Sequence, residues 1–265
     1  MNSRLSIYVS SPDSYSDVFA IFYTAFKKYW NNCPYEFVFA TNTQKYDGIR
    51  CLCNNKTGDT WVERTIAALP HICTKYILLM CDDLIITDYI NNDEINKILD
   101  YMECNNIKYC RLKPLRFGKG IKELSSVCYV NKQTPYAVNL QIGIIRKDYF
   151  AELLGDGSIS AWEIENVLNK QSSTSNEEYY KDIISVNRPI IPFVHGVWKG
   201  KWIRSSYTYI KMCYPDYSFE RPILPFYTDL KIRAIDFIEK NVSFSTRRRI
   251  KSILMKLGMS FSTRN

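Results

Sequence analysis

The sequence lacks long hydrophobic runs, which argues against a membrane-spanning protein. None of the apolar runs in its 265 residues approaches the roughly 20 residues that a transmembrane helix needs. The segment Met1–Leu5 leads directly into a strand-like run and carries no apolar core of the kind found in secretory signal peptides. We therefore expect a cytoplasmic protein.

Histidines are few, and the two common glycine-rich phosphate-binding motifs are absent. The chain has two histidines, which disfavours a zinc site. Neither GxGxxG nor GxxxxGKS/T occurs, so dinucleotide-binding and P-loop interpretations lose support. The nine cysteines are odd in number and scattered, which argues against a disulfide framework and for a reducing compartment. We expect them to serve as small core residues.

Positive charge is concentrated near the end of the chain. The net charge is +8, and residues 229–265 carry nine basic side chains against three acidic ones. Apolar spacing predicts two amphipathic helices there, 229–240 and 245–257. A basic helical tail of this kind either contacts an anionic membrane surface through 229–257 or packs on the main domain with its basic side in water. We place the boundary between a main domain, 1–227, and this tail, 228–265.

The order of predicted elements indicates an α/β fold. Hydrophobic residues make up 46% of the chain and charged residues 23%, as in globular proteins. The first elements follow the order β-α-β-β-α-β, which predicts a Rossmann-type, mixed, mostly parallel sheet flanked by helices. Residues 113–135 show little periodicity and are expected to be irregular, apart from a short strand near 126–129. The other predicted elements are strands at 5–10, 36–40, 48–53, 76–80, 108–112, 137–146 and 189–195, and helices at 14–30, 61–69, 92–105, 147–154 and 161–168.

The stretch Tyr76–Leu84 carries the main candidate site. Its apolar part fits a central strand buried on both faces, and Asp82 and Asp83 follow it. Open α/β sheets bind ligands beyond the carboxyl ends of such strands, and a buried carboxylate is costly unless it is paired or bound to a cation. A divalent cation carrying a substrate diphosphate would supply the counter-charge. The alternative is a turn in which Asp83 caps the next segment.

A second candidate site lies at Ser160–Glu165. Trp162 stands beside Glu163 and Glu165, which suits sugar chemistry, because an aromatic face covers a sugar and a glutamate accepts the proton of an attacking hydroxyl. The structural alternative is a capping box formed by Ser160 and Glu163 at a helix start. Both interpretations hold together if Glu163 caps the helix and Glu165 is the base.

Further candidates lie beyond other predicted strand ends. His195, followed by Lys199 and Lys201, suits binding of a metal or a phosphate, although a lone histidine is more often a hydrogen-bonded structural residue. Four more side chains stand where contacts to a base, a ribose or a phosphate are made, and for each of them capping or a surface ion pair is the structural alternative. These four are Asp13, Asp59, Trp61 and Arg64.

Together these motifs resemble a family of bacterial GT-A-type glycosyltransferases encoded in capsule and O-antigen clusters. The resemblance spans roughly residues 5–205 and rests on the order and spacing of the motifs. The motifs are Ser11–Asp17, Asp59–Arg64, Tyr76–Asp83, Leu140–Tyr149, Trp162–Glu165 and His195–Gly196.

The resemblance implies a GT-A-like catalytic domain that takes a nucleotide-sugar donor, most simply a UDP-sugar, with a divalent metal, Mn²⁺ or Mg²⁺, at Asp83 and His195. The donor-binding residues would be Asp13 near the nucleobase, Arg64 near ribose or phosphate, and Asp59, Trp61, Asp82, Lys199 and Lys201. Trp162 and Gln141 would contact the acceptor, and Glu165 or Glu163 would be the base. A glutamate that acts directly as base predicts inversion at the sugar carbon.

The sequence departs from the family pattern at two points. The usual Asp-x-Asp motif is here Cys81-Asp82-Asp83, so its first carboxylate is missing. The usual acidic pair on the acceptor side is here Trp-Glu-x-Glu, so the identity of the base stays open between Glu163 and Glu165.

The resemblance also implies an acceptor and a location. A glycan or a lipid-linked oligosaccharide would accept the sugar at the inner face of the cytoplasmic membrane. Two other functions stay open: a nucleotidyltransferase acting on sugar phosphates, and a non-catalytic protein that uses the basic tail on a membrane or on RNA. A nucleotidyltransferase normally has a glycine-rich loop near the first strand, which Ser10–Ser14 does not offer. The tail lacks an RNA-stacking signature such as the RNP aromatics, so no nucleic-acid partner is expected.

Overall fold

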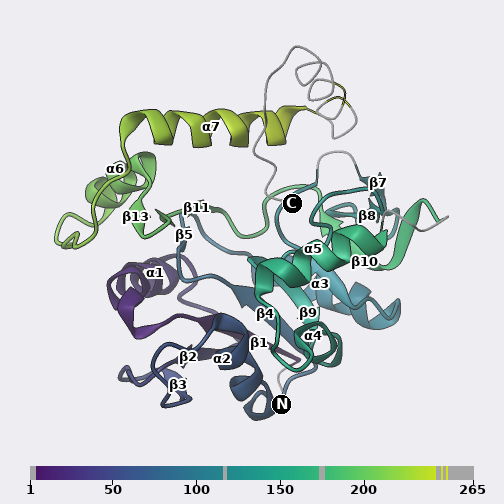
Figure 1. Cartoon of the computed structure of the whole chain (residues 1–265). Coiled ribbons are helices and arrows are strands. Elements are labelled where there is room, and N and C mark those ends of the chain that lie inside the picture. The colour runs from purple at the N-terminus through teal and green to yellow at the C-terminus, as the bar shows by residue number, and fades with distance from the viewer. Residues whose placement is uncertain (1–3, 116–117, 173–176, 243–245, 247–248, 250–265) are drawn as a thin grey trace. The chain divides into compact units, whose positions relative to one another are not determined.

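The computed structural model describes residues 4–115, 118–172, 177–242, 246 and 249 (Figure 1). The chain divides into two units, Met1–Ile223 and Leu224–Asn265, which are considered separately. The strands are β1 (Leu5–Ser10), β2 (Glu36–Thr41), β3 (Arg50–Cys53), β4 (Tyr76–Met80), β5 (Leu84–Ile86), β6 (Tyr109–Arg111), β7 (Lys119–Gly120), β8 (Val127–Asn131), β9 (Ile142–Arg146), β10 (Tyr179–Val186), β11 (Phe193–His195), β12 (Val197–Trp198) and β13 (Lys201–Trp202). The helices are α1 (Ser16–Tyr29), α2 (Trp61–Ala68), α3 (Asn92–Cys104), α4 (Lys147–Leu154), α5 (Ala161–Ser172), α6 (Arg204–Cys213) and α7 (Phe226–Asn241), with 3₁₀ turns η1 (Asp13–Tyr15) and η2 (Leu69–His71).

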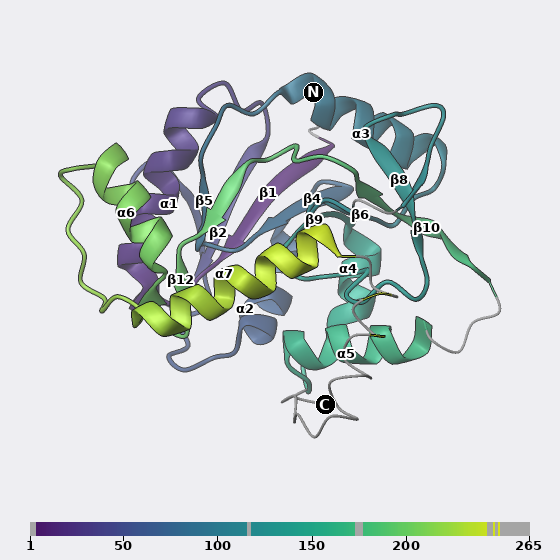
Figure 2. The same cartoon turned by 90° about the horizontal axis from the view of Figure 1, so that it is seen from above.

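The main sheet has the strand order β3-β2-β1-β4-β9-β6-β10-β8-β7. β1 pairs in parallel with β2 and β4, and β2 pairs in parallel with β3. β9 runs antiparallel between β4 and β6, and β8 runs antiparallel between β10 and β7. This mixed, mostly parallel sheet flanked by helices confirms the predicted fold class (Figure 2).

Helices cover both faces of the sheet, which explains why every residue of β1 and β4 is buried. One core contains Ile7 and Leu78 and lies against α1 and α3, and the other contains Tyr8 and Ile77 and lies against α2, α4 and α5. Successive side chains of one strand therefore belong to different cores, as the period of two in a strand requires. The apolar run at 76–80 consequently forms a central strand, as predicted.

Two predicted strands are much shorter than expected. The segment 137–141 is a loop and β9 begins at Ile142, because the side-chain oxygen of Asn139 accepts the backbone N–H groups of Gln141 and Ile142 at 3.3 Å each, which holds a turn. The strand predicted at 189–195 is limited to β11, since the prolines at 189 and 192 have no N–H to donate. The sequence pattern also gave no indication of β10 or α6.

The second unit contains α7, which begins three residues before the predicted helix 229–240. The other predicted tail helix, 245–257, lies outside the described residues apart from 246 and 249. Within the described segments, no helix combines the length and the apolar character needed to cross a membrane.

Candidate active site

Asp82 and Asp83 follow β4 after Cys81, where the ends of β1 and β4 meet the start of β9. The Ser11 hydroxyl, just beyond β1, donates a hydrogen bond to the Asp82 carboxylate, and the Cys81 N–H donates to the Gln141 carbonyl at 3.1 Å, just before β9. Asp82 is only 8% exposed, and burial raises its pKa to about 6 despite the Ser11 hydrogen bond. The strand end is therefore tied to both neighbouring strands.

Asp83 is held from the other side by the segment after β11. Its carbonyl accepts the Gly196 N–H at 2.7 Å, and its carboxylate accepts the Val197 N–H. Burial and the adjacent charge of Asp82 raise the pKa of Asp83 to about 7. Two neighbouring carboxylates repel each other when both are ionised, and carboxyl groups with pKa values raised in this way are common at functional sites.

These carboxylates fit a hard divalent cation. Magnesium and manganese bind carboxylate oxygens, and Mg²⁺ is commonly held by one or two carboxylates together with substrate phosphates and water. Among the described residues, no cluster of three or more His, Cys, Asp or Glu side chains could hold a metal by itself. A cation at Asp83 would therefore take further ligands from the substrate and from water.

His195 and the two predicted lysines lie on the segments that hold Asp83. β11 pairs antiparallel with β5, and this register places His195 opposite Leu84, the residue after Asp83. Lys199 and Gly200 form the two-residue turn between β12 and β13 with φ values of 49° and 74°, as a type I′ turn requires. Lys199 and Lys201 are exposed at this turn. Their contacts to donor or metal stay predictions.

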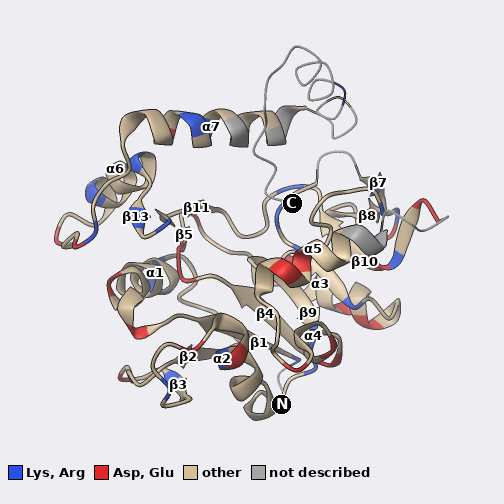
Figure 3. Cartoon of the chain, in the orientation of Figure 1, with Lys and Arg blue, Asp and Glu red and all other residues tan. Residues whose placement is uncertain are grey.

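The two glutamates of α5, coloured red in Figure 3, have different surroundings. Glu163 forms the expected capping box: its carboxylate accepts the Ser160 N–H at 2.8 Å and the Ser160 hydroxyl at 2.7 Å, and these bonds lower its pKa. Glu165 is half-buried and accepts the Leu140 N–H at 2.7 Å. Burial raises the pKa of Glu165. The structural role of Glu163 leaves Glu165 as the better candidate for the base.

Glu165 lies within electrostatic range of the β4 end. Burial, followed by the charges of Asp83, Asp82 and Glu165, raises the pKa of the Cys81 thiol well above its ordinary value. Leu140, which binds Glu165, is adjacent to Gln141, which binds Cys81. The side chains of Trp162 and Gln141 are exposed, as an acceptor contact requires.

Asp13 is engaged by the loop after β2. Its carboxylate accepts the Thr43 hydroxyl at 2.6 Å and the backbone N–H groups of Asn42 and Thr43 at 3.0–3.2 Å. Burial raises the pKa of Asp13, but the hydrogen bonds outweigh burial and leave the pKa below its ordinary value. Asp13 therefore orders the loop between β2 and β3, and its contact to a nucleobase stays a prediction.

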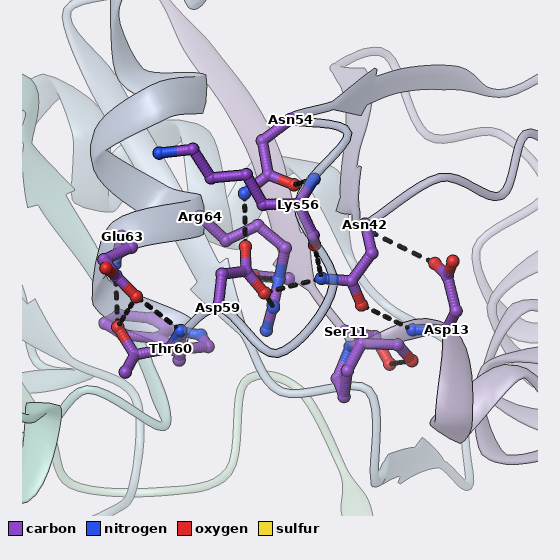
Figure 4. A network of polar contacts seen from close by, with 12 residues as sticks. Ser11, Asp13, Asn42, Asn54, Lys56, Asp59, Thr60, Glu63 and Arg64 are labelled. Atoms are coloured by element: carbon purple, nitrogen blue, oxygen red, sulfur yellow. Dashed lines mark hydrogen bonds and ion pairs between the residues drawn. The ribbon is translucent and has the colours of Figure 1, made fainter.

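Asp59 and Arg64 form a buried ion pair, with side chains 1% and 3% exposed (Figure 4). The Asp59 carboxylate also accepts the side-chain amides of Asn42 and Asn54, and Arg64 donates from Nε to the Ser10 hydroxyl at 3.0 Å. The structural alternative for Asp59 and Arg64 was a surface ion pair, whereas the pair in the structure is buried. It connects the ends of β1, β2 and β3.

A cavity of about 310 Å³ lies beside this network. Arg64, Asn54 and Lys45 line it together with Cys51 and Leu52 of β3. Trp61, at the start of α2, lies outside the lining and packs its ring 6.2 Å from that of Phe150. Of the three predicted donor residues around α2, Arg64 lines the cavity, although its side chain is 3% exposed.

Arg221 is a residue that the sequence analysis missed. Its guanidinium binds both carboxylate oxygens of Asp17 at 2.8–3.1 Å and lies 4.0 Å from the ring centroid of Tyr15. Its charge also lowers the pKa of Asp82 against the larger effect of burial. No local motif marks Arg221, because its partners lie about two hundred residues earlier in the chain.

No protein-family model matches the chain, and no curated protein matches it in sequence. Among solved structures, the chain is similar to S. aureus TarS 1–349 at 11% identity, covering 69% of this chain and 60% of that one, with a TM-score of 0.44. It is similar to a cytidylyltransferase from Leptospira borgpetersenii serovar Hardjo-bovis at 12% identity, covering 91% and 95%, with a TM-score of 0.45. It is also similar to the galactosyltransferase LgtC, solved with donor and acceptor sugar analogs, at 10% identity, covering 67% and 68%, with a TM-score of 0.36. The match to TarS spans less than two thirds of that chain, and at these scores the likenesses carry no argument about function.

Proposed function

We propose that the protein is a glycosyltransferase, which moves a sugar from a nucleotide-diphosphate sugar to a hydroxyl of a glycan or lipid-linked oligosaccharide acceptor. The observation that carries this proposal is the placement of the Asp82–Asp83 pair at the end of β4, with Glu165 linked to the same edge through Leu140 and Gln141. An acidic cation site and a separate carboxylate base are what a two-substrate sugar transfer needs. A role in capsule or O-antigen synthesis is part of the proposal.

The donor side consists of residues around β1, β3 and β4. Asp83 would bind the divalent cation. Asp82, whose carboxylate accepts a hydrogen bond from Ser11, would lie beside Asp83. A bound divalent cation would neutralise negative charge on the departing diphosphate. The cavity beside Arg64 has a volume of about 310 Å³, at the lower end of the usual range for small-molecule pockets, and supports binding of the nucleoside there.

On the acceptor side, Glu165 acts as the general base. The Leu140 N–H holds one carboxylate oxygen and orients the group, so the other oxygen can accept a proton. The acceptor hydroxyl loses its proton to Glu165 and forms a bond to the anomeric carbon, while the bond from that carbon to the diphosphate oxygen breaks and its electron pair leaves with the nucleotide. One displacement of this kind inverts the anomeric carbon. The raised pKa of Glu165 makes it a stronger base than an ordinary glutamate.

A ligand screen tests the proposal. Thermal shift and calorimetry are measured with UDP-, GDP-, TDP- and CMP-sugars, with and without Mn²⁺ or Mg²⁺. A ligand that binds only the folded protein stabilises it by roughly 2.7 kcal/mol at about a hundredfold excess over Kd. We expect a metal-dependent shift with one nucleotide, lost in Asp83→Asn and kept in the matched control Asp148→Asn, whose carboxylate is 68% exposed.

The product identifies the reaction. Sugar transfer releases a nucleoside diphosphate, whereas a nucleotidyltransferase acting on a sugar phosphate releases pyrophosphate. Binding by Asp83→Asn equal to that of the wild type would refute the cation site at Asp83. Absence of binding by every nucleotide sugar would refute the glycosyltransferase proposal and favour the non-catalytic alternative.

A further inference from the structure

The segment 214–223, which we call the strap, follows α6 and returns along β13. The backbone N–H of Trp202 donates to the Pro222 carbonyl at 2.9 Å, and Trp202 forms a parallel β-bridge with Ile223. The rings of Tyr217 and Phe219 lie 6.0 and 5.5 Å from the Trp202 ring, edge-on. Trp202 is fully buried, so the strap is fixed to β13 by both its backbone and its aromatic side chains.

The same contacts connect the strap to the β4 end. A Cβ atom added to Gly196 would lie 3.0 Å from the Trp202 ring and 3.2 Å from the Asp83 carbonyl, so Trp202, Gly196 and Asp83 are packed in one layer. The Gly196 N–H donates to this Asp83 carbonyl. On its other side the strap is fastened to α1, because the Tyr217 hydroxyl donates to the Asp17 carbonyl at 2.7 Å.

Arg221 lies on this strap, and two of the three nitrogens of its guanidinium form hydrogen bonds to the protein. Nε and Nη2 bind Asp17 and the Ser14 carbonyl, and the group is stacked on Tyr15. Within the part of the chain that the structure describes, Nη1 donates no hydrogen bond to protein. A Cβ atom on Gly200 would lie 4.0 Å from Nη1, so this nitrogen faces the turn of the β12–β13 hairpin.

A guanidinium held in this way suits a phosphate group. Arginine has five N–H donors in a fixed plane, and the Asp17 contacts orient that plane before any ligand binds. The β12–β13 hairpin also carries Lys199 in its turn and Lys201 at the start of β13, both exposed. Arg221 donates a hydrogen bond to the Ser14 carbonyl, which belongs to η1. This turn begins two residues after Ser11, whose hydroxyl donates to the Asp82 carboxylate. The charge of Arg221 therefore acts on the β4 end, where it lowers the pKa of Asp82 against the larger effect of burial.

We propose that Arg221 binds the diphosphate of the donor through Nη1, on the side opposite the Asp82–Asp83 pair, with Lys199 and Lys201 supplying further positive charge. This inference rests on the proposed function and names the residue that holds the leaving group. The structural alternative is an ion pair with Asp17 that only fastens the strap to α1. The two interpretations differ in what the loss of Asp17 should do.

The experiment measures binding of UDP, UMP and inorganic pyrophosphate, each with Mg²⁺, by calorimetry. Loss of a hydrogen bond to a charged group corresponds to about a 10- to 100-fold weaker affinity. We expect this loss for UDP and pyrophosphate in Arg221→Gln, a smaller loss in Arg221→Lys, and little change for UMP. Asp17→Asn keeps the cation and one acceptor oxygen for it, so its loss of affinity should be smaller than that of Arg221→Gln. Arg50→Gln, which removes an arginine paired with Glu36 at the far end of β3, is the matched control.

The outcomes separate this inference from the proposed function. Wild-type affinity of Arg221→Gln for UDP and pyrophosphate would overturn it, and so would equal losses in Asp17→Asn and Arg221→Gln, which would mark the pair as a fastening only. Nucleotide-sugar binding that does not depend on Arg221 would leave the glycosyltransferase proposal intact. Pyrophosphate binding that depends on Arg221, without any nucleotide-sugar binding, would support the diphosphate site and refute the glycosyltransferase.

Discussion

The buried pair of Asp59 and Arg64 offers a sharp test of how the strand ends are held together. Asp59→Ala removes the carboxylate that is paired with the Arg64 guanidinium, a side chain that is 3% exposed. Of the hydrogen bonds that Arg64 makes with the described part of the chain, the one to Ser10 would remain, and the Asn54 amide would lose its acceptor. The change leaves a charge buried without its partner, which is the costly way to break an ion pair.

Removing one member of a buried ion pair destabilises a protein by about 3–5 kcal/mol. In a unit of the size of Met1–Ile223, a loss of about 1 kcal/mol corresponds to about 2–4 °C in Tm, so we expect Tm to fall by about 6–20 °C. Asp59→Asn keeps the shape of the side chain and removes the charge, so its Tm should lie between those of the wild type and Asp59→Ala.

Urea unfolding followed by circular dichroism measures this loss. The free energies of unfolding are compared at an unchanged m-value, which shows that the folded and unfolded states keep their compactness. Asp148→Ala is the control, because its ion pair with Arg146 has a carboxylate 68% exposed and should contribute at most about 1 kcal/mol. If Asp59→Ala costs no more than this control, then the pair is solvated, and our account of the network is wrong.

Three further predictions concern the base, the acidic pair and the tail. Glu165→Gln should lower kcat by about 10²–10⁴-fold with little change in donor affinity, whereas Glu163→Gln, which can still complete the capping box, should keep its turnover; the reverse result would make Glu163 the base. Because burial raises the pKa values of Asp82 and Asp83 to about 6 and about 7, these two carboxyls bind more protons in the folded protein than in the unfolded chain between about pH 4 and 7. The free energy of unfolding in EDTA should therefore fall as pH rises through this window, and the fall should be smaller in Asp83→Asn. The wild type and Asp83→Asn having the same dependence of Tm on pH from pH 5 to 8 would contradict this. Deletion of 242–265 should reduce sedimentation with anionic liposomes and leave donor binding intact, and unchanged sedimentation would remove the membrane-anchor proposal.

Local pattern was sufficient for the elements that end at the candidate site. The bounds predicted for β1 and β4 are those of the structure, because both strands are short apolar runs followed by polar residues. The capping box at Ser160 was also visible in the sequence, since it depends on residues three apart. The start of β9 was not, because the side chain of Asn139 ends the extended backbone in an otherwise apolar run.

Long-range contacts were out of reach of such patterns. The guanidinium of Arg221 meets Asp17 across 204 positions, and nothing in the sequence around Arg221 marks it. The carboxylate of Glu165 meets the N–H of Leu140 only because α5 packs beside the loop before β9. Sequence could propose which side chains have the right chemistry, but the fold decides which of them share an edge.

The reversed direction of β9 has a consequence for how the two substrates are divided. Because β9 runs against β4, the loop that precedes it opens at the same edge where β4 ends. A parallel strand in this place would have put its preceding loop at the opposite edge. In the proposed reaction, one reversed strand brings two independent halves together: β1 to β4 handle the donor, and the 137–141 loop with α5 handles the acceptor. Length changes in that loop would therefore alter which hydroxyl is presented without rebuilding the donor half, so acceptor choice can diverge while the donor is retained.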